Sequence, residues 1–381
     1  MTATIYPGDC LASLRRLPDG VARTCVTSPP YYGLRDYGTA TWEGGDPACD
    51  HRPNVKSRAT RPLGKLHAGF ATIDASTVQR DCHCGARRID DQIGLEETPE
   101  AYVARLVEVF REVRRVLADD GTLWLNLGDS YAADRGGTTP PAETLAGGVG
   151  GWAENGERTN RGRKDGYNPT RNAPAMGLKH KDLIGIPWRV AFALQADGWY
   201  LRSDIIWHKP NPMPESVRDR PTKAHEYVFL LSKRERYYYD AAAIAEAAAN
   251  PDGFKYAGGY KNTLHMVEES KRVNVGSARL ANGTVPHFKA GHGEARNART
   301  VWTIATQPYP EAHFATFPEE LPSRCIRAGS APGDTVLDPF GGSGTTGAIA
   351  VGLGRKAILC ELNPAYIELA RQRIGPMLCE V

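Results

Sequence analysis

The sequence predicts an α/β protein built on a mostly parallel sheet that carries helices on both faces. Short apolar strands alternate with amphipathic helices, and a strand–helix–strand order of this kind closes as a parallel crossover unit. The clearest unit has strands over 335–338 and 356–361, with a helix over 345–353 between them. Residues 99–117 repeat apolar side chains at helical spacing and precede a strand over 122–127. Because ligands bind beyond the carboxyl ends of such strands, we expect a site there.

The other elements are predicted in chain order by the same patterns. Thr98 and Pro99 mark the start of the long helix, and Gly121 follows its end. The remaining predictions are strands over 4–6, 24–26, 199–207 and 227–231, helices over 11–17 and 182–197, a hairpin partner over 236–239 and a last helix after Asn363.

The bulk composition is that of a globular protein. The chain is 41% hydrophobic and 24% charged, and its 381 residues can form one large domain with insertions or two domains. It has no run of about 18 apolar residues, which excludes a membrane span, and its first residues lack a secretory signal pattern. Cys10, Cys25, Cys325 and Cys360 lie in apolar runs, as reduced thiols do in cytosolic proteins. We therefore expect a cytoplasmic protein.

Positive charge is concentrated in three segments without sustained apolar periodicity. Residues 51–90 carry eight Lys or Arg against three Asp or Glu, residues 131–180 seven against five, and residues 251–300 eight against four. Their charge sums to +11 in a chain of net charge +3, so the remainder carries −8. The segments are either solvated loops or contacts for a polyanion, and nucleic acid is the expected partner.

Residues 27–33 read Thr-Ser-Pro-Pro-Tyr-Tyr-Gly and follow a short apolar strand. Proline fixes φ, lacks an N–H and holds the residue before it extended. The Ser28 hydroxyl, the Pro29 carbonyl and the Tyr31 ring are therefore expected to form a small polar pocket with an aromatic wall. An ordinary exit from a strand into a turn is the alternative, since Ser-Pro and Pro-Pro are common in loops.

Residues 338–346 read Asp-Pro-Phe-Gly-Gly-Ser-Gly-Thr-Thr, and Glu361 closes the next strand. Glycines let the backbone approach a ligand, and a carboxylate at the next strand end can accept from both ribose hydroxyls. The spacing is neither a dinucleotide fingerprint nor a P-loop, which favours an adenosine ligand without a pyrophosphate. Asp338 can meet a ligand ammonium, and Phe340 can pack on an apolar part. A tight turn before a helix is the alternative, but it does not explain the two carboxylates.

Together, the two motifs resemble those of the S-adenosylmethionine-dependent DNA amino-methyltransferases. In that family a Ser/Asp/Asn-Pro-Pro-Tyr/Phe/Trp motif is catalytic and a Phe-x-Gly-x-Gly motif binds the cofactor. The resemblance implies a class I methyltransferase (Rossmann-like) fold with a mostly parallel seven-stranded sheet. The catalytic motif comes first, as in the circularly permuted β-group. It further implies one domain over 1–381, with a basic insertion over 38–97, a flexible insertion over 131–181, a target-recognition region over 241–312 and a cofactor-binding part over 313–381.

The resemblance also assigns roles to individual residues. The catalytic residues would be Ser28, Pro29, Pro30 and Tyr31. S-adenosylmethionine would contact strand ends, the glycine turn and the segment before them: Asp9, Cys10, Thr27, Phe317, Pro318, Asp338, Phe340, Gly341, Gly342, Ser343, Gly344, Thr345, Glu361 and Asn363. Lys209 and Arg220 lie in segments that resemble family segments near the flipped base, and are expected to contact phosphates of double-stranded DNA.

The implied reaction is methylation of the exocyclic amine of a base flipped out of the duplex. The amine lone pair is delocalised into the base, so hydrogen bonds to Ser28 and to the Pro29 carbonyl would favour a nucleophilic, pyramidal nitrogen while the base stacks on Tyr31. In the family, a leading serine usually accompanies cytosine N4, which is the favoured target. Adenine N6 is the alternative, because a hydroxyl both donates and accepts.

Other functions stay open at this point. They are methylation of RNA or of a protein amine, DNA binding without catalysis and, with least support, nicotinamide-dependent redox chemistry. No nuclease motif is visible, so a restriction partner would be a separate chain. The motifs fit a monomer or a homodimer.

Cysteine and histidine residues bracket the first basic insertion. Cys49 and His51 precede it, and Cys82, His83 and Cys84 follow it. Two close ligand pairs separated by a loop suit a tetrahedral structural zinc, which would stabilise a loop with few apolar residues. The predicted ligands are Cys49, His51, Cys82 and Cys84, with His83 as a substitute. Each pair has one intervening residue instead of the usual two, so surface thiols in a disordered loop are the alternative.

Overall fold

The computed structural model describes residues 1–33, 39, 41–51, 82–89, 92–133, 176–247, 295–307 and 318–380. The chain divides into two compact units. The main unit comprises Met1–Tyr239 and Thr300–Val381, and the small unit comprises Asp240–Arg299. Phe317 and most of the three basic segments lie outside the described residues, so the expectations for them stay predictions.

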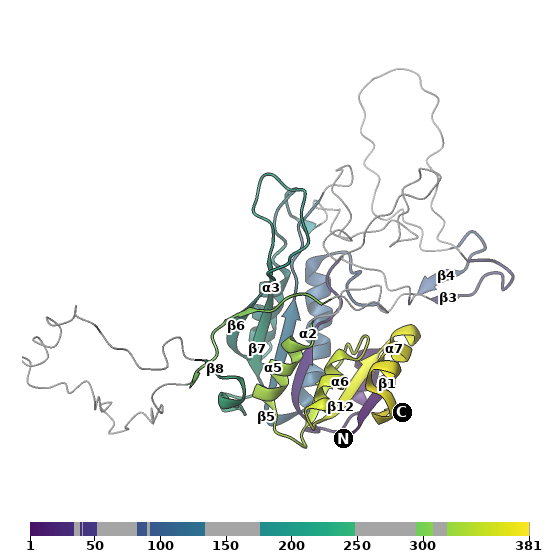
Figure 1. The fold of residues 1–381 in the computed structure, drawn as a ribbon. Coiled ribbons are helices and arrows are strands. Elements are labelled where there is room, and N and C mark those ends of the chain that lie inside the picture. Colours follow the sequence, from purple (N-terminus) through teal and green to yellow (C-terminus); the bar gives the residue numbers. More distant parts are fainter. Residues whose placement is uncertain are drawn as a thin grey trace, which may run out of the picture. The chain divides into compact units, whose positions relative to one another are not determined.

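A nine-stranded sheet forms the centre of the main unit (Figure 1). Its strands are, in spatial order, β10 (Val301–Thr303), β6 (Tyr200–His208), β7 (His225–Ser232), β5 (Leu117–Leu127), β2 (Ala22–Thr27), β11 (Thr335–Asp338), β12 (Lys356–Glu361), β1 (Ala3–Pro7) and β13 (Leu378–Glu380). All neighbours are parallel except the two pairs that include β7. The predicted α/β class is confirmed, and three-residue edge strands, β10 and β13, extend the expected seven.

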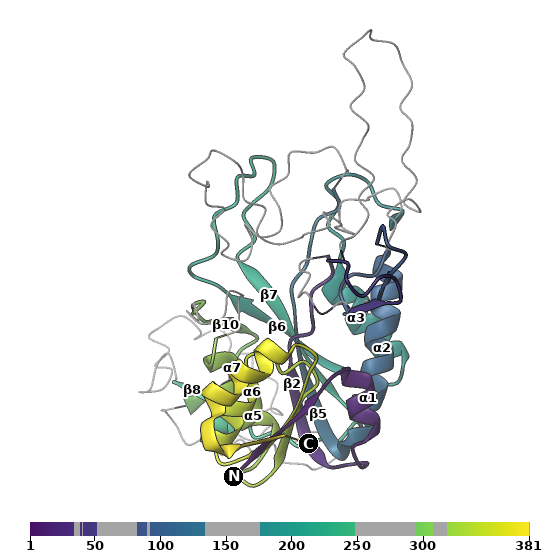
Figure 2. The same ribbon diagram turned by 90° about the vertical axis from the view of Figure 1, so that its right-hand side faces the viewer.

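Helices cover both faces of this sheet (Figure 2). One layer contains α1 (Cys10–Arg15), α2 (Pro99–Val116) and α3 (Ile186–Ala196), and the other contains α5 (Glu320–Gly329), α6 (Thr345–Gly352) and α7 (Pro364–Ile374). Helix α2 begins as predicted, because the Thr98 side chain accepts from the Ala101 N–H at 3.2 Å and Pro99 occupies the first turn. Leu106 and Phe110 of its apolar stripe are fully buried. Parallel strands with both faces covered place the core on both sides of the sheet.

Strands from the two ends of the chain lie side by side in the middle of the sheet. Strand β11 pairs with β2, with Leu337 opposite Cys25, and on its other side with β12. Both Leu337 and Cys25 are inaccessible to solvent. The Ser-Pro-Pro-Tyr turn after β2 and the glycine turn after β11 therefore leave the same edge of the sheet from neighbouring strands.

Two element predictions are corrected by the structure. Residues 236–239 form no strand, because the Tyr238 N–H makes a single bond to the Asp120 carbonyl at 2.9 Å in place of a ladder. The helix expected from residue 182 begins at Ile186, because Gly185 adopts a left-handed conformation with φ 77° directly before it.

Two smaller sheets complete the described structure. In the main unit, β3 (Thr41–Glu43) pairs antiparallel with β4 (Arg87–Ile89). In the small unit, β8 (Glu246–Ala247) pairs with β9 (Ala295–Arg296) after a short helical turn over Ala242–Ile244, and Glu246 forms ion pairs with Arg296 and Arg299. Among the helices of the described ranges, none combines the length and the apolar character that a membrane crossing requires.

Candidate active site at the carboxyl edge of the sheet

A hydrogen bond joins the two sequence motifs. The Thr27 hydroxyl at the end of β2 donates to Asp338 Oδ1 at the end of β11 over 2.6 Å, and the Phe340 N–H donates to the same oxygen over 3.0 Å. Asp338 is 1% exposed. Burial raises the pKa of its carboxyl above the ordinary value, and the bonds from Thr27, Thr346 and Phe340 oppose that rise. A buried carboxylate at a strand end, held by neutral donors and not by a protein cation, is suited to meet a positively charged ligand group.

Glu361 closes the next strand and is held by backbone donors. Its two carboxylate oxygens accept from the Gly342 N–H and the Asn363 N–H, each over 2.7 Å. Burial raises the pKa of Glu361 to about 7, with Asp338 adding to the rise and the two backbone bonds opposing it. The Asn363 side chain accepts from the Ala365 N–H and begins α7. The nucleoside end of the predicted site is therefore a fixed carboxyl whose charge changes near neutral pH.

The glycine turn between these carboxyls packs tightly on α7. Gly344 has φ +79°, and a Cβ there would lie 2.8 Å from the Ala370 Cβ. Arg373 of α7 donates to the hydroxyls of Ser343 and Thr345, at 2.9 and 2.5 Å. Both hydroxyl-bearing residues are buried. Ser343 and Thr345 thus fasten the turn to α7, while their predicted contact with a cofactor stays a prediction.

Asp9 and Cys10 lie beside Glu361, because the Gly8 N–H donates to the Glu361 carbonyl at 2.8 Å. Asp9 caps α1 through the Ala12 N–H at 2.8 Å and lies 3.8 Å from Arg105. Cys10 is buried, and that burial, with the charge of Asp9, raises the pKa of its thiol to about 12. The thiol is neutral at physiological pH, so Cys10 can line an apolar wall but cannot supply a thiolate.

The Ser-Pro-Pro-Tyr turn is anchored by a chain of side chains. Ser28 Oγ donates to the Tyr31 hydroxyl over 3.3 Å, and that hydroxyl lies 2.7 Å from Glu226 Oε2 and 3.0 Å from Asn126 Oδ1. Burial, and then the nearby Glu226 charge, raise the pKa of Tyr31 well above its ordinary value. Tyr31 is therefore a neutral phenol. Its ring has room because residue 128 is glycine, where a Cβ would lie 2.6 Å from the ring.

Glu226 connects this chain to Lys209. Lys209 Nζ is 2.5 Å from Glu226 Oε1 and lies over the Trp207 ring at 4.4 Å from its centroid. Burial alone would raise the pKa of Glu226, but the Lys209 charge and the bonds from Lys209, Tyr31 and Asn126 outweigh it and lower the pKa below the ordinary value. Glu226 is therefore ionised, and Lys209 has a partner within the protein. We name Ser28, Tyr31, Asn126, Glu226 and Lys209 the base-side network.

Both prolines of the motif belong to a rigid turn. Pro29 is buried, and the Pro30 carbonyl accepts from the Tyr102 hydroxyl at 2.9 Å. Pro318 is also buried and begins the turn that leads into α5, where its carbonyl accepts from the Leu321 N–H at 3.0 Å.

Arg220, one of the two residues predicted to contact DNA, forms an ion pair with Glu215 at 2.6 Å and lies over the Tyr131 ring at 3.9 Å from its centroid. Contact of Lys209 and Arg220 with DNA stays a prediction.

The structure adds two residues that the sequence patterns did not single out. Asn126 is an amide inside the otherwise apolar end of β5, and such a polar residue in a buried strand is a signal of function. Glu226 gives no comparable signal, because its strand β7 runs antiparallel and brings its amino end to the carboxyl edge of the others.

The predicted metal ligands are also brought together. The ligand atoms of Cys49, His51, Cys82 and Cys84 all lie within 4.8 Å of one another.

Comparison with known proteins points to DNA methylation. A model of the DNA methylase family N6_N4_Mtase matches residues 22–372. The Type II methyltransferase M.Cfr9I of Citrobacter freundii is 40% identical over 372 residues, which cover 98% of this chain and 87% of that protein.

Two solved structures share the fold at low sequence identity. The cytosine-N4-specific PvuII DNA methyltransferase has a TM-score of 0.52 and 17% identity, covering 98% of this chain and 86% of that one. A putative DNA modification methylase of Thermus thermophilus, complexed with S-adenosyl-L-methionine, has a TM-score of 0.50 and 19% identity, covering 100% and 98%.

Proposed function

The chain belongs to the family of S-adenosylmethionine-dependent DNA amino-methyltransferases, and we propose that it methylates N4 of cytosine at a specific sequence in double-stranded DNA. The observation that carries this proposal is the Thr27–Asp338 hydrogen bond of 2.6 Å. It joins the strand end before Ser28 to the strand end that we assign to the methionine part of the cofactor. A methyl donor bound at Asp338 and an amine bound at Ser28 would then share one crevice.

On the cofactor side, we assign Asp338 to the ammonium group and Glu361 to the ribose hydroxyls. Asp338 is buried beside Thr27, and Glu361 has both oxygens aligned by backbone N–H groups. S-adenosylmethionine supplies an electrophilic methyl group on sulfur. Holding that group still against the incoming amine is the main contribution we assign to the protein, because proximity and orientation can supply most of the rate gain.

On the base side, Ser28 is assigned as acceptor for one amine N–H and the Pro29 carbonyl as acceptor for the other. Ser28 already gives its own proton to the Tyr31 oxygen, so its lone pairs are free for an N–H donor. With both amine protons held, the nitrogen lone pair can leave conjugation and attack the methyl carbon. The N–C bond forms as the S–C bond breaks, and the nitrogen then loses a proton to water. The neutral Tyr31 ring, held by Glu226, would form the stacking surface for the flipped base.

The choice of base follows from Ser28. In the family a leading serine usually accompanies cytosine N4, whereas the hydroxyl chemistry itself also permits adenine N6. Relatives named Type II methyltransferases support site-specific modification within restriction–modification, with any nuclease on a separate chain. We assign sequence recognition to residues 241–312 and phosphate contact to Arg220 and Lys209. The DNA substrate and the absence of disulfides among the eight cysteines of the described residues support a cytoplasmic location.

Nucleoside mass spectrometry tests this proposal. Unmodified DNA of varied sequence is incubated with the full chain and S-adenosylmethionine, then digested to nucleosides. The expected product is N4-methylcytosine, absent from a parallel reaction with Ser28→Ala. N6-methyladenine would keep the reaction type and overturn the choice of base. A failure to modify any DNA, with S-adenosylmethionine still bound, would contradict the proposed function.

A further inference from the structure

Four metal-ligand side chains meet at the end of a small sheet that the methyl-transfer chemistry does not use. Cys49 and His51 follow strand β3, and Cys82 and Cys84 precede strand β4. The two strands pair antiparallel with Glu43 opposite Arg87. This pairing brings the end of β3 and the start of β4 together, so the two ligand pairs lie next to each other although about 30 residues separate them in sequence.

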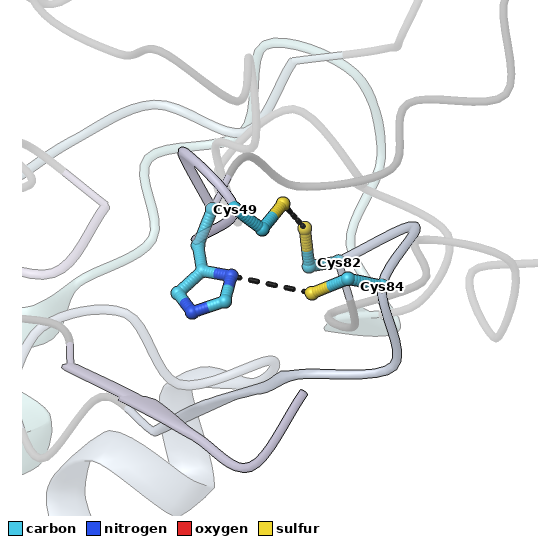
Figure 3. A group of neighbouring side chains, drawn as sticks. Cys49, Cys82 and Cys84 are labelled. Carbon is cyan, nitrogen blue, oxygen red and sulfur yellow. Dashed lines mark hydrogen bonds between the residues drawn. The ribbon is translucent and has the colours of Figure 1, made fainter. Parts of the chain in front are cut away.

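Two of the distances between the ligand atoms are close to those of a tetrahedral metal site, and all four ligand atoms lie within 4.8 Å of one another. Cys49 Sγ lies 3.6 Å from Cys82 Sγ, and Cys84 Sγ lies 3.3 Å from His51 Nδ1 (Figure 3). Zinc bonds of about 2.3 Å to sulfur and about 2.1 Å to nitrogen set tetrahedral ligand atoms roughly 3.5–3.8 Å apart. The same sulfur–sulfur distance is far beyond the roughly 2.05 Å of a disulfide. Cys49 of one turn and Cys82 of the other point their sulfurs toward each other.

Backbone hydrogen bonds shape both turns around the ligands. In the second turn, the Cys82 N–H donates to the Ala86 carbonyl at 2.7 Å and the Gly85 N–H donates to the Cys82 carbonyl at 2.9 Å. In the first, the Cys49 N–H donates to the Asp46 carbonyl at 3.0 Å. The turns approach closely at Gly45, where a Cβ would lie 2.8 Å from Cys84 Sγ and 2.6 Å from the Ala86 nitrogen. The two turns therefore hold the four ligand side chains close together through their own backbone hydrogen bonds.

We propose that Cys49, His51, Cys82 and Cys84 bind one structural Zn²⁺ that ties together the two ends of segment 52–81. Thiolates and imidazole favour zinc over magnesium or calcium, which prefer oxygen ligands. Four protein ligands leave no position for water or substrate, which makes the site structural and not catalytic. The proposal is independent of which base the chain methylates.

His83 provides a matched comparison within the same turn. Its ring is exposed and lies beside two of the sulfurs, with Nε2 3.5 Å from Cys49 and Nδ1 3.4 Å from Cys82. It is not among the four residues whose ligand atoms are all within 4.8 Å of one another. The structure therefore assigns the nitrogen ligand to His51, and His83→Ala should leave the metal in place.

Elemental analysis of the purified full chain tests the site. We expect one zinc per chain in the wild type and in the controls His83→Ala and Cys379→Ser, which removes an exposed cysteine outside the cluster. We expect zinc to be lost from Cys82→Ser/Cys84→Ser and from His51→Ala. Wild-type chain without stoichiometric zinc, or zinc lost equally from Cys379→Ser, would overturn the proposal. Loss from His83→Ala with retention in His51→Ala would overturn the ligand assignment.

Cobalt substitution gives a second readout that needs no variant. Wild-type chain exchanged with Co²⁺ should show the visible ligand-field absorption of a tetrahedral thiolate site, and one equivalent of Zn²⁺ should remove it. Cobalt that binds with an octahedral spectrum, or fails to bind, would contradict a site of three cysteines and one histidine.

Discussion

The two halves of the candidate active site are held in different ways. In the cofactor half, the carboxyls of Asp338 and Glu361 accept backbone N–H groups of Phe340, Gly342 and Asn363, all within one strand–turn–helix–strand unit. In the base half, Ser28 and Tyr31 depend on Asn126 of β5, on Glu226 of β7 and on Lys209, which directly follows β6. Backbone donors survive most substitutions, whereas each side chain of a network can be removed. The cofactor half should therefore be sensitive to substitution at its carboxyls, at its glycines and at Thr27, whose hydroxyl donates to Asp338, whereas the base half should be sensitive at every member of its network.

The largest expected effect is a loss of affinity for S-adenosylmethionine when the cofactor half is changed at Asp338. Asp338→Asn removes the charge assigned to the ligand ammonium while preserving the side-chain shape. A hydrogen bond to a charged group contributes about 1.5–3 kcal/mol, so the affinity for S-adenosylmethionine should fall roughly ten- to hundredfold. Isothermal titration calorimetry measures the change. Asp334→Asn, at the opposite end of β11, is the matched control and should bind normally. If both variants bound S-adenosylmethionine equally weakly, the assignment of Asp338 to the ligand ammonium would be contradicted.

Two glycine substitutions test how each half is packed. Gly344→Ala forces a Cβ against Ala370 at a positive φ, so the free energy of unfolding should fall by about 2 kcal/mol. Gly128 has no positive φ, and the three atoms nearest to an added Cβ all belong to the Tyr31 ring. Gly128→Ala should reduce turnover by displacing that ring, with a smaller loss of stability. Urea denaturation measures the stability of both variants, and single-turnover assays measure their rates. A larger loss of stability in Gly128→Ala than in Gly344→Ala would contradict the prediction.

The base-side network predicts a loss of rate without a loss of cofactor. Glu226→Gln weakens the hold on Tyr31 and leaves the Lys209 charge without its partner. We expect kcat to fall about tenfold, equivalent to about 1.4 kcal/mol, with the affinity for S-adenosylmethionine unchanged. Glu320→Gln removes an exposed partner of Arg324 on α5 and should change neither quantity. Unaltered turnover in Glu226→Gln would exclude the network from catalysis.

The smallest expected effect is a pH dependence of cofactor binding. Since the pKa of Glu361 is raised to about 7 in the folded chain, its carboxylate form, which accepts ribose hydroxyls, fills in as pH rises through that value. The affinity for S-adenosylmethionine should rise by up to about tenfold from pH 6 to pH 8. The stability of the free protein should change in the opposite direction. Because the pKa of Glu361 is higher in the folded chain than in the unfolded chain, the free energy of unfolding falls as pH rises from the ordinary pKa to about 7. Glu361→Gln should flatten both profiles in calorimetry and in denaturation.

The same contrast explains what the sequence could predict. Gly342 and Glu361 are 19 residues apart within one supersecondary unit, so a local pattern was enough to predict that the glycine turn and this carboxyl lie together. Tyr31 bonds Asn126 and Glu226 across 95 and 195 residues, and no local pattern reports such pairings. The bonds from Arg373 of α7 to the hydroxyls of Ser343 and Thr345 were not predicted either, because they depend on how that helix packs. The strand and helix order was predictable because its periodicity is local, whereas the hairpin over 236–239 was wrong because pairing depends on distant strands.

The claim that one half of the site binds the cofactor and the other half positions the base is tested most directly by two measurements on Ser28→Ala. The affinity for S-adenosylmethionine and the single-turnover rate of methyl transfer are determined on one preparation. We predict an unchanged affinity, since Thr27 and Asp338 are intact, and a rate reduced by about a hundredfold through loss of one positioned hydrogen bond. An unchanged rate, or a loss of cofactor binding as large as the loss of rate, would contradict this claim.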